Sequence, residues 1–141
     1  MKARVNWVEN VLFVAESGSG HSIVLDGAAE GGGRNMGMRP MELMALSVGS
    51  CSSYDVVTIL KKAKQWVTAC EAEVTAERVD GTPATFESIH LHFKVTGFDL
   101  SEKHVQRAIE LSAAKYCSAS IMMKNAGVKV THDFEVHEAE K

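Results

Sequence analysis

Residues 40–65 read PMELMALSVGSCSSYDVVTILKKAKQ, and this stretch decides the fold. Its opening proline suits the first turn of a helix, where the missing N–H costs nothing. Between Glu42 and Asp55 there is no charged residue. A helix that is apolar on every side is a buried one, so we expect a long central helix that ends at Lys64 or Gln65.

Alternating apolar and polar residues precede and follow this helix, which indicates strands with one solvated face. The other expected elements are a three-stranded meander over residues 1–26, hairpin strands at 68–78 and 88–95, helices at 101–116 and 118–125, and a last strand at 128–136. The order is βββ-α-ββ-αα-β, which predicts an α+β fold. A length of 141 residues favours one domain over residues 1–141.

Small residues lie along the central helix, among them Ser47, Gly49 and Ser50. They would let a second helix approach closely, and one small domain cannot easily surround an all-apolar helix by itself. We therefore expect a homodimer that buries this helix.

Charge and hydropathy exclude two classes of function. A formal net charge of −3 argues against nucleic-acid binding, which needs clustered Lys and Arg. The longest apolar stretch is interrupted by polar residues, and we expect it to be too short to span a bilayer, which takes about 20 residues. Residues 1–4 run directly into strand-like sequence, so we expect no signal peptide and a cytoplasmic protein.

The three cysteines, Cys51, Cys70 and Cys117, have no CxxC spacing, so neither a disulfide framework nor a structural zinc site is predicted. A buried cysteine is most often a small hydrophobic residue. His90 and His92 share one strand face, but no third metal ligand is evident in the nearby sequence, so we interpret them as part of a solvated face. We expect no metal and no cofactor.

The position of Cys51 in the middle of the helix gives it no help from the positive N-terminal end, which activates many thiols. Burial raises the pKa of a thiol, so a reactive Cys51 needs a nearby cation. The candidates are Arg34 and Arg39, just before the helix, and Arg4 on the first strand. Asp55, one turn after Cys51, opposes a thiolate unless an arginine answers it.

Two motifs resemble those of the OsmC/Ohr family, the osmotically inducible and organic-hydroperoxide-resistance proteins. In that family a proline followed by an acidic residue leads, eleven residues after the proline, to a cysteine among small residues, and Pro40 and Cys51 have this spacing. The segment KYCSAS at 115–120 resembles the family's second-cysteine segment, usually Cys-Pro-x-Ser. The order of elements agrees too, so the resemblance covers nearly the whole chain.

The resemblance implies an intertwined homodimer, in which antiparallel sheets wrap around a long buried central helix, and a peroxidase mechanism. Cys51 would attack an organic hydroperoxide and become a sulfenic acid. Cys117 would then form a disulfide with it, which a dithiol such as a lipoyl group, or another thiol reductant, would reopen. The apolar surroundings of Cys51 favour an alkyl or fatty hydroperoxide over hydrogen peroxide.

The chain departs from the family pattern at the activating carboxylate. The residue after the proline is Met41, and Glu42 is the nearest substitute. Glu42 lies nine residues before Cys51, which is half a turn away on a regular helix. For the family's arginine, Arg34 is the first choice and Arg39 the second. These differences indicate a divergent branch, similar to the YhfA-like members.

The departure leaves a second hypothesis open: a non-catalytic dimeric binding module of the same fold, which holds a small apolar or thiol-containing ligand.

Overall fold

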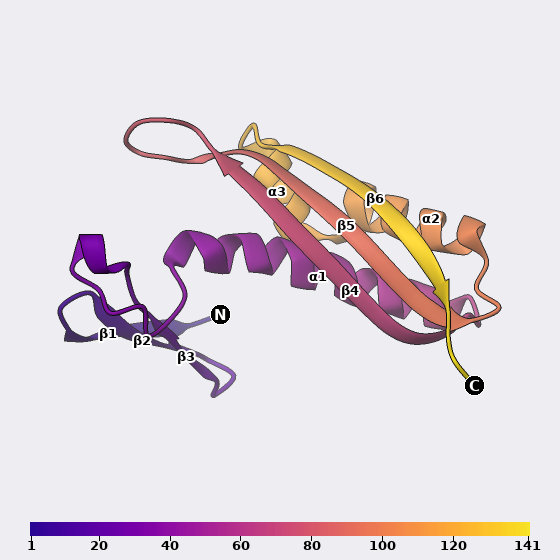
Figure 1. Cartoon of the computed structure of the whole chain (residues 1–141), viewed down its shortest axis with the longest axis horizontal. Helices are drawn as coiled ribbons and strands as arrows, with labels where there is room; N and C mark the ends of the chain where they lie inside the picture. The colour runs from indigo at the N-terminus through magenta and orange to yellow at the C-terminus, as the bar shows by residue number, and fades with distance from the viewer. The chain divides into compact units, whose positions relative to one another are not determined.

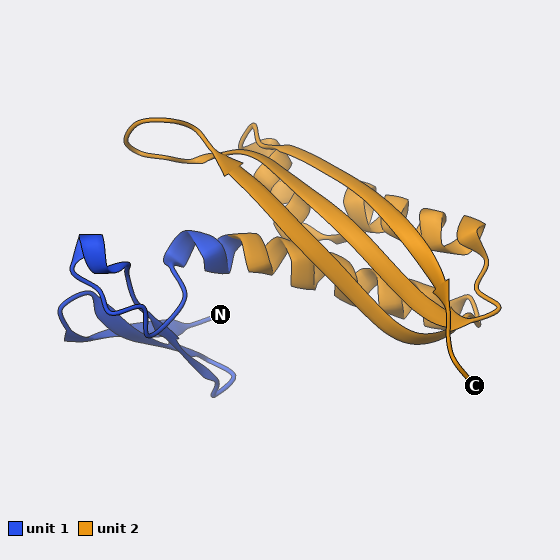
Figure 2. Cartoon of the chain, in the orientation of Figure 1, with its two compact units in different colours: residues 1–44 blue, residues 45–141 orange.

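The structure, a computed structural model, describes residues 1–141. Figure 1 shows its elements in chain order: β1 (Ala3–Glu9), β2 (Leu12–Ser17), β3 (Ser22–Leu25), η1 (Ala29–Gly31), α1 (Pro40–Lys62), β4 (Trp66–Arg78), β5 (Phe86–Phe98), α2 (Glu102–Leu111), η2 (Ser112–Tyr116), α3 (Ser118–Asn125) and β6 (Lys129–Glu138). The chain divides into two units, residues 1–44 and 45–141 (Figure 2). The expected order of strands and main helices is confirmed.

Unit 1 is the expected meander, in which β2 pairs antiparallel with both β1 and β3. Asp26, at the end of β3, organises the loop that follows. Its carboxylate accepts hydrogen bonds from the main-chain N–H groups of Gly27, Arg34 and Met36 at 2.7, 3.2 and 3.1 Å. No apolar side chain of unit 1 is buried, so the meander has no core of its own.

Unit 2 holds a three-stranded sheet in the order β4-β5-β6, and here the expectation of antiparallel sheets was wrong in part. β4 and β5 form the predicted antiparallel hairpin, but β6 pairs parallel with β5. The segment from α2 to α3 connects β5 to β6 and returns the chain to the starting end of β5. A crossover of this length is what parallel neighbours require, whereas a short turn allows only antiparallel pairing.

The core of unit 2 lies between the sheet and the helices. Its fully buried side chains include Val48, Val56 and Leu60 on α1, and Ile89 and Val95 on β5. At roughly 25 cal/mol per Å² of buried apolar surface, each such residue contributes about 1.5–3 kcal/mol.

Within the single chain α1 is buried along one side only, whereas the sequence led us to expect full burial in a homodimer. Its buried residues, Val48, Gly49, Ser52, Val56 and Leu60, form one stripe along the helix. On the remaining surface, Leu46 is 49% and Tyr54 74% exposed. A stripe of this kind is the ordinary pattern of a helix packed on one side only.

The length of α1 also corrects the expectation that no segment is long enough to span a bilayer. The helix has 23 residues, and an 18-residue window within it reaches a mean hydropathy of 1.4, so by length and composition it could cross a membrane. Core helices of soluble proteins meet the same criterion. The stripe of α1 that packs into unit 2 gives it the position of a core helix.

The helix expected over residues 101–116 is regular only to Leu111. Residues 112–116 form a π-helical turn, which is closed by the bond from the Cys117 N–H to the Ser112 carbonyl at 2.9 Å. Cys117 then adopts an extended conformation that separates this turn from α3. Single π turns within helices often lie at functional sites.

Candidate functional site

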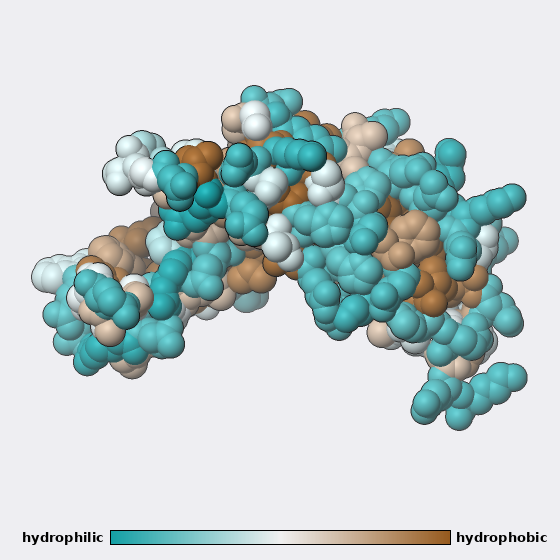
Figure 3. All heavy atoms as spheres, turned by 45° about the horizontal axis from the view of Figure 1, so that its top comes forward, coloured by the Kyte–Doolittle hydropathy of each residue, from teal (hydrophilic) through white to brown (hydrophobic).

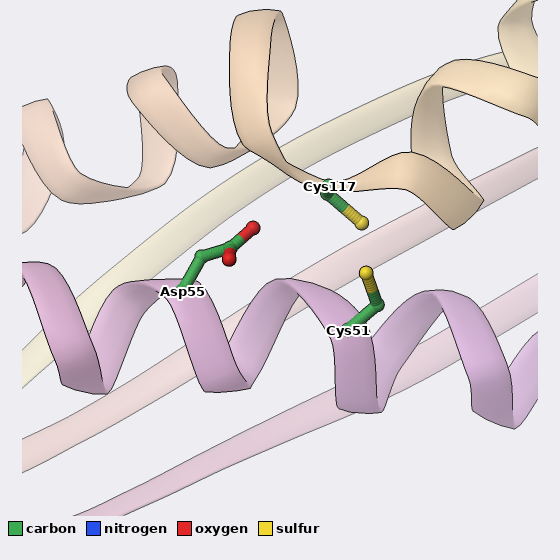
Figure 4. A group of neighbouring side chains, drawn as sticks. All are labelled: Cys51, Asp55 and Cys117. Carbon is green, nitrogen blue, oxygen red and sulfur yellow. The ribbon is translucent and has the colours of Figure 1, made fainter.

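Cys51, Asp55 and Cys117 form a cluster in unit 2. The two sulfur atoms and a carboxylate oxygen of Asp55 all lie within 4.8 Å of one another. Figure 4 shows the two thiols pointing toward each other, Cys51 from α1 and Cys117 from the segment between η2 and α3, with the Asp55 carboxylate beside them. Both thiols are free, Cys51 half-buried and Cys117 fully buried.

The helical spacing of α1 places two members of the cluster on one face. Cys51 and Asp55 are four residues apart, which brings side chains together on the same side of a helix. The third member of the cluster, Cys117, lies at the break after the π turn. Cys117 is the N-cap residue of α3, and its sulfur takes the usual role of a capping oxygen by accepting a hydrogen bond from the Ser120 N–H at 3.3 Å.

Serine hydroxyls hold the cluster in place. The Ser52 Oγ donates to the Cys117 sulfur at 3.2 Å. The Ser112 Oγ donates to Asp55 Oδ2 at 2.8 Å. Ser52 and Ser112 are 3% and 1% exposed; the bond from Ser52 is buried, and the bond from Ser112 to the half-buried Asp55 is part-buried. The structure thus gives Asp55 a serine hydroxyl as its hydrogen-bond partner.

Burial raises the pKa of the Cys117 thiol above its ordinary value, because a thiolate loses its hydration there. The Ser52 hydroxyl and the Ser120 N–H act in the opposite direction, since both donate to the sulfur, and the nearby Cys51 adds to the rise. Cys117 is thus held as a thiol in the reduced protein. That state suits a residue that acts second, after another sulfur has been oxidised.

The remaining cysteine, Cys70, lies on β4 and does not belong to the cluster. Burial raises the pKa of its thiol. Cys70 thus agrees with its interpretation as a small, inert hydrophobic residue. It provides a matched control for experiments on Cys51 and Cys117.

The other expected site residues lie in unit 1. Arg34 forms an ion pair with Glu9 on β1. The Arg39 guanidinium donates to the Asn35 side-chain oxygen at 2.7 Å and to the Gly37 carbonyl at 3.1 Å. These contacts occupy both guanidinium groups within their own unit.

Glu42 caps the start of α1. Its carboxylate accepts a hydrogen bond from the Arg39 main-chain N–H at 2.8 Å, the bond that an acidic residue at the third helical position makes in a capping box. Met36, Met38, Arg39 and Glu42 line an open hollow of about 620 Å³ together with Asn35 and Gly37. Met41, at the position of the family's usual carboxylate, is half-buried.

The histidines of β5 have an acidic neighbour that lies far away in the sequence and comes close only in the fold. Asp133 Oδ1, on the parallel strand β6, lies 2.9 Å from His90 Nε2 and 2.7 Å from His92 Nδ1. The hydrogen bond with Asp133 raises the pKa of His92 above its ordinary value. The Asp133 side chain is 60% exposed, and the face of unit 2 in Figure 3 is mostly hydrophilic, as expected for a solvated strand face.

Sequence reasoning missed Ser52 and Ser112 as supports of the thiols. A serine beside Cys51 was visible, but only the fold shows that it reaches Cys117, 65 residues away. Ser120 stands where the Cys-Pro-x-Ser pattern has its serine, so that pattern was the one available signal.

Fold and cluster together define an α+β protein in which a free thiol on the central helix, Cys51, faces a second free thiol, Cys117, at the start of α3. The family model described as OsmC-like protein matches residues 31–133. Protein YhfA of Escherichia coli (strain K12) is 46% identical over 136 residues, which cover 96% of this chain and 98% of YhfA. The chain belongs to the OsmC family.

Solved structures agree with this assignment. A protein structure from structural genomics shares 45% sequence identity, with a TM-score of 0.88 over 99% of this chain and 100% of that one. An organic hydroperoxide resistance protein OsmC from Legionella pneumophila has a TM-score of 0.70 at 16% identity, over 98% of this chain and 96% of that one, which shows the shared fold.

Proposed function

We propose that this protein is a thiol-dependent peroxidase that reduces organic hydroperoxides, with Cys51 as the attacking and Cys117 as the resolving residue. The observation that carries the proposal is the facing pair of sulfur atoms within 4.8 Å in unit 2. The solved structures of the same fold include an organic hydroperoxide resistance protein, which adds support.

Three steps complete the cycle. The Cys51 thiolate attacks the distal oxygen of ROOH and the O–O bond breaks, which yields a Cys51 sulfenic acid and an alkoxide; the alkoxide takes up the proton that the Cys51 thiol released and leaves as the alcohol ROH. The Cys117 sulfur displaces the hydroxyl of the sulfenic acid, so that a Cys51–Cys117 disulfide forms and water leaves. An external dithiol reduces the disulfide through a mixed disulfide and is itself oxidised to a cyclic disulfide.

The thiolate of Cys51 needs a cation, and we assign this role to Arg34 first and Arg39 second, supplied by the same chain or by the second chain of a dimer. Glu42 is the carboxylate available to orient the guanidinium in place of the one missing at Met41. The Glu42 carboxylate would then either keep its hydrogen bond to the Arg39 main-chain N–H while it also binds the guanidinium, or give up that bond for the guanidinium.

Apolar residues around the thiols favour an alkyl or fatty hydroperoxide, and we propose a lipoyl-type dithiol or another thiol as the reductant. Met36 and Met38, in the hollow of unit 1, are suited to line an entrance for such a substrate. A cytoplasmic location accords with three free cysteines, because the cytosol keeps thiols reduced.

We infer that residues 1–141 act as one domain completed in a homodimer. An isolated three-stranded meander with no buried apolar side chain is not stable in water. Val5 and Trp7 on β1 are 61% and 66% exposed, and Tyr54 on α1 is 74% exposed. A second copy of the chain is the partner that would cover such surfaces. Light scattering at micromolar concentration should give twice the mass of the chain, and a monomer would contradict the inference.

The test of the activity is dithiol-dependent turnover of cumene hydroperoxide by the purified protein, followed by loss of dihydrolipoamide. Cys51→Ser should abolish turnover, while Cys70→Ser, the matched control, should keep it. If the wild type turns over no faster than Cys51→Ser, the protein is not a peroxidase.

The contacts of Glu42 favour a second candidate, the non-catalytic binding module. Its carboxylate bonds to a main-chain N–H and has no guanidinium partner among its hydrogen bonds, so the activating pair of the family is not formed. In that case a Cys51→Ser protein would bind a small apolar or thiol ligand as tightly as the wild type, without chemistry.

A further inference from the structure

We propose that the reduced cluster of Cys51, Asp55 and Cys117 is a binding site for Zn²⁺, with three protein ligands and one open position. The proposal goes beyond the peroxidase activity and does not depend on it, although the two share both thiols. It departs from the expectation from sequence, where the absence of CxxC spacing argued against a zinc site.

Convergence of the three ligand atoms is the first argument. The two sulfur atoms and the Asp55 oxygen all lie within 4.8 Å of one another. In a tetrahedral zinc site with Zn–S bonds of about 2.3 Å, two sulfur ligands lie about 3.8 Å apart. The two sulfur atoms would therefore have to approach each other by about 1 Å at most, which is within the reach of side-chain rotation.

The spacing of the ligands is the second argument. Cys51 and Asp55 are at positions i and i+4 of α1, the arrangement by which one helix presents two ligands to a single metal ion. Cys117 reaches them from a different segment, as Figure 4 shows. Zinc prefers thiolate, imidazole and carboxylate ligands, and this set supplies two thiolates and one carboxylate.

Hydrogen bonds to the ligands are the third argument. The Ser112 hydroxyl fixes the Asp55 carboxylate through Oδ2, which leaves the other carboxylate oxygen for a metal ion. The Ser52 hydroxyl and the Ser120 N–H both donate to the Cys117 sulfur and would stabilise its thiolate. Bonds of this kind orient ligands in established metal sites, and their loss typically lowers affinity about 10–100-fold.

Binding is a proton exchange, since Zn²⁺ takes the place of the two thiol protons and releases them to solvent. Zinc and peroxide then compete for Cys51, and a Cys51–Cys117 disulfide would remove both sulfur ligands. Occupancy would thus protect the reduced thiols, and it would block the proposed peroxidase activity until the metal is withdrawn, which is the one consequence that rests on that function.

The experiment is a titration of the reduced, metal-free full-length protein with Zn²⁺ alone, measured by calorimetry and by competition with a zinc dye. Wild type should bind one Zn²⁺ per chain, and Cys70→Ser should bind it equally well. Cys51→Ser should weaken binding at least about 100-fold, Asp55→Asn and Ser112→Ala about tenfold. Far-UV circular dichroism of each variant checks that it is folded, and Co²⁺ substitution should give the absorption of tetrahedral thiolate coordination in the wild type.

Absence of saturable binding by the wild type would overturn the proposal, as would equal affinity of folded Cys51→Ser or Asp55→Asn. The two proposals fail separately. A protein that binds zinc through these residues without turning over hydroperoxide refutes the peroxidase alone, and active protein without zinc affinity refutes the metal site alone.

Discussion

The hydrogen bond between Ser112 and Asp55 joins η2 to α1 next to the thiols, and its removal should have a measurable cost. Ser112 is 1% exposed, and its hydroxyl donates to Asp55 Oδ2 at 2.8 Å. A hydrogen bond to a charged group contributes about 1.5–3 kcal/mol, because its loss leaves a half-buried carboxylate without its partner. We therefore expect Ser112→Ala to lower the free energy of unfolding by about 2 kcal/mol.

Urea denaturation at fixed protein concentration measures this change. With a urea dependence of about 1–3 kcal/mol per molar, the midpoint should fall by roughly 1 M. The matched control is Ser50→Ala on the exposed face of α1, where the hydroxyl bonds only to the Ser47 carbonyl at 3.3 Å. That variant should stay within about 0.5 kcal/mol of the wild type.

A double-mutant cycle separates the bond from the loss of the serine itself. The coupling energy between Ser112→Ala and Asp55→Ala should be about 1.5–3 kcal/mol. A coupling below about 0.5 kcal/mol would refute the reasoning, because it would mean that the two side chains do not interact in solution.

Three further perturbations test other parts of the account. Gly49→Ala on α1 should lower the free energy of unfolding, measured by urea denaturation, by about 1–3 kcal/mol, because the added Cβ would lie 2.6 Å from Val74 Cγ2. An unchanged free energy of unfolding would contradict the close approach of α1 to Val74. Asp133→Asn should lower the thermal unfolding temperature more at about pH 6 than at pH 8.5. The raised pKa of His92 contributes stability that is present below the ordinary pKa of 6.5 and is lost as the pH rises through the pKa of the folded protein. An equal loss of stability at both pH values would argue against this reasoning. Asp26→Ala should destabilise the loop of unit 1, and this effect should disappear in acid. Hydrogen bonds from main-chain N–H groups, first of all that of Met36, lower the pKa of Asp26, so the stability that Asp26 contributes is present above its unfolded pKa and is lost as the pH falls through its folded pKa. Hydrogen exchange of the loop amides at two pH values measures this change.

Local sequence patterns were enough to predict most of the elements. The alternation in residues 68–78 and 88–95 gave the hairpin, and Pro40 marked the start of α1. The pairing of β6 with β5 could not be predicted in the same way. Alternation tells which face of a strand is apolar, but it carries no information on strand direction, which depends on where the connecting segment returns.

The cysteine pair of the candidate site was predictable from the sequence, but the residues that support it were not. Both cysteines could be singled out from their neighbourhoods, and the structure brings them together. The π turn that precedes Cys117 was not visible, because one extra residue per turn leaves the apolar pattern of α2 almost unchanged. The partner of Asp55 was also unknown, since Ser112 is 57 residues away in sequence and only the fold brings it to Asp55.

The role of Glu42 shows a further limit. The spacing on a regular helix placed Glu42 half a turn from Cys51. That spacing left open whether Glu42 could orient an arginine. The structure gives it a capping bond to the Arg39 main chain, a contact that depends on loop geometry before the helix.

The most direct test of the central claim is the mass of the intact, reduced protein after one equivalent of cumene hydroperoxide. We predict the loss of two hydrogen atoms per chain, with peptide mapping that joins Cys51 to Cys117, and a gain of one oxygen atom at Cys51 in the Cys117→Ser variant. A wild-type protein of unchanged mass, or a disulfide that involves Cys70, would contradict the account.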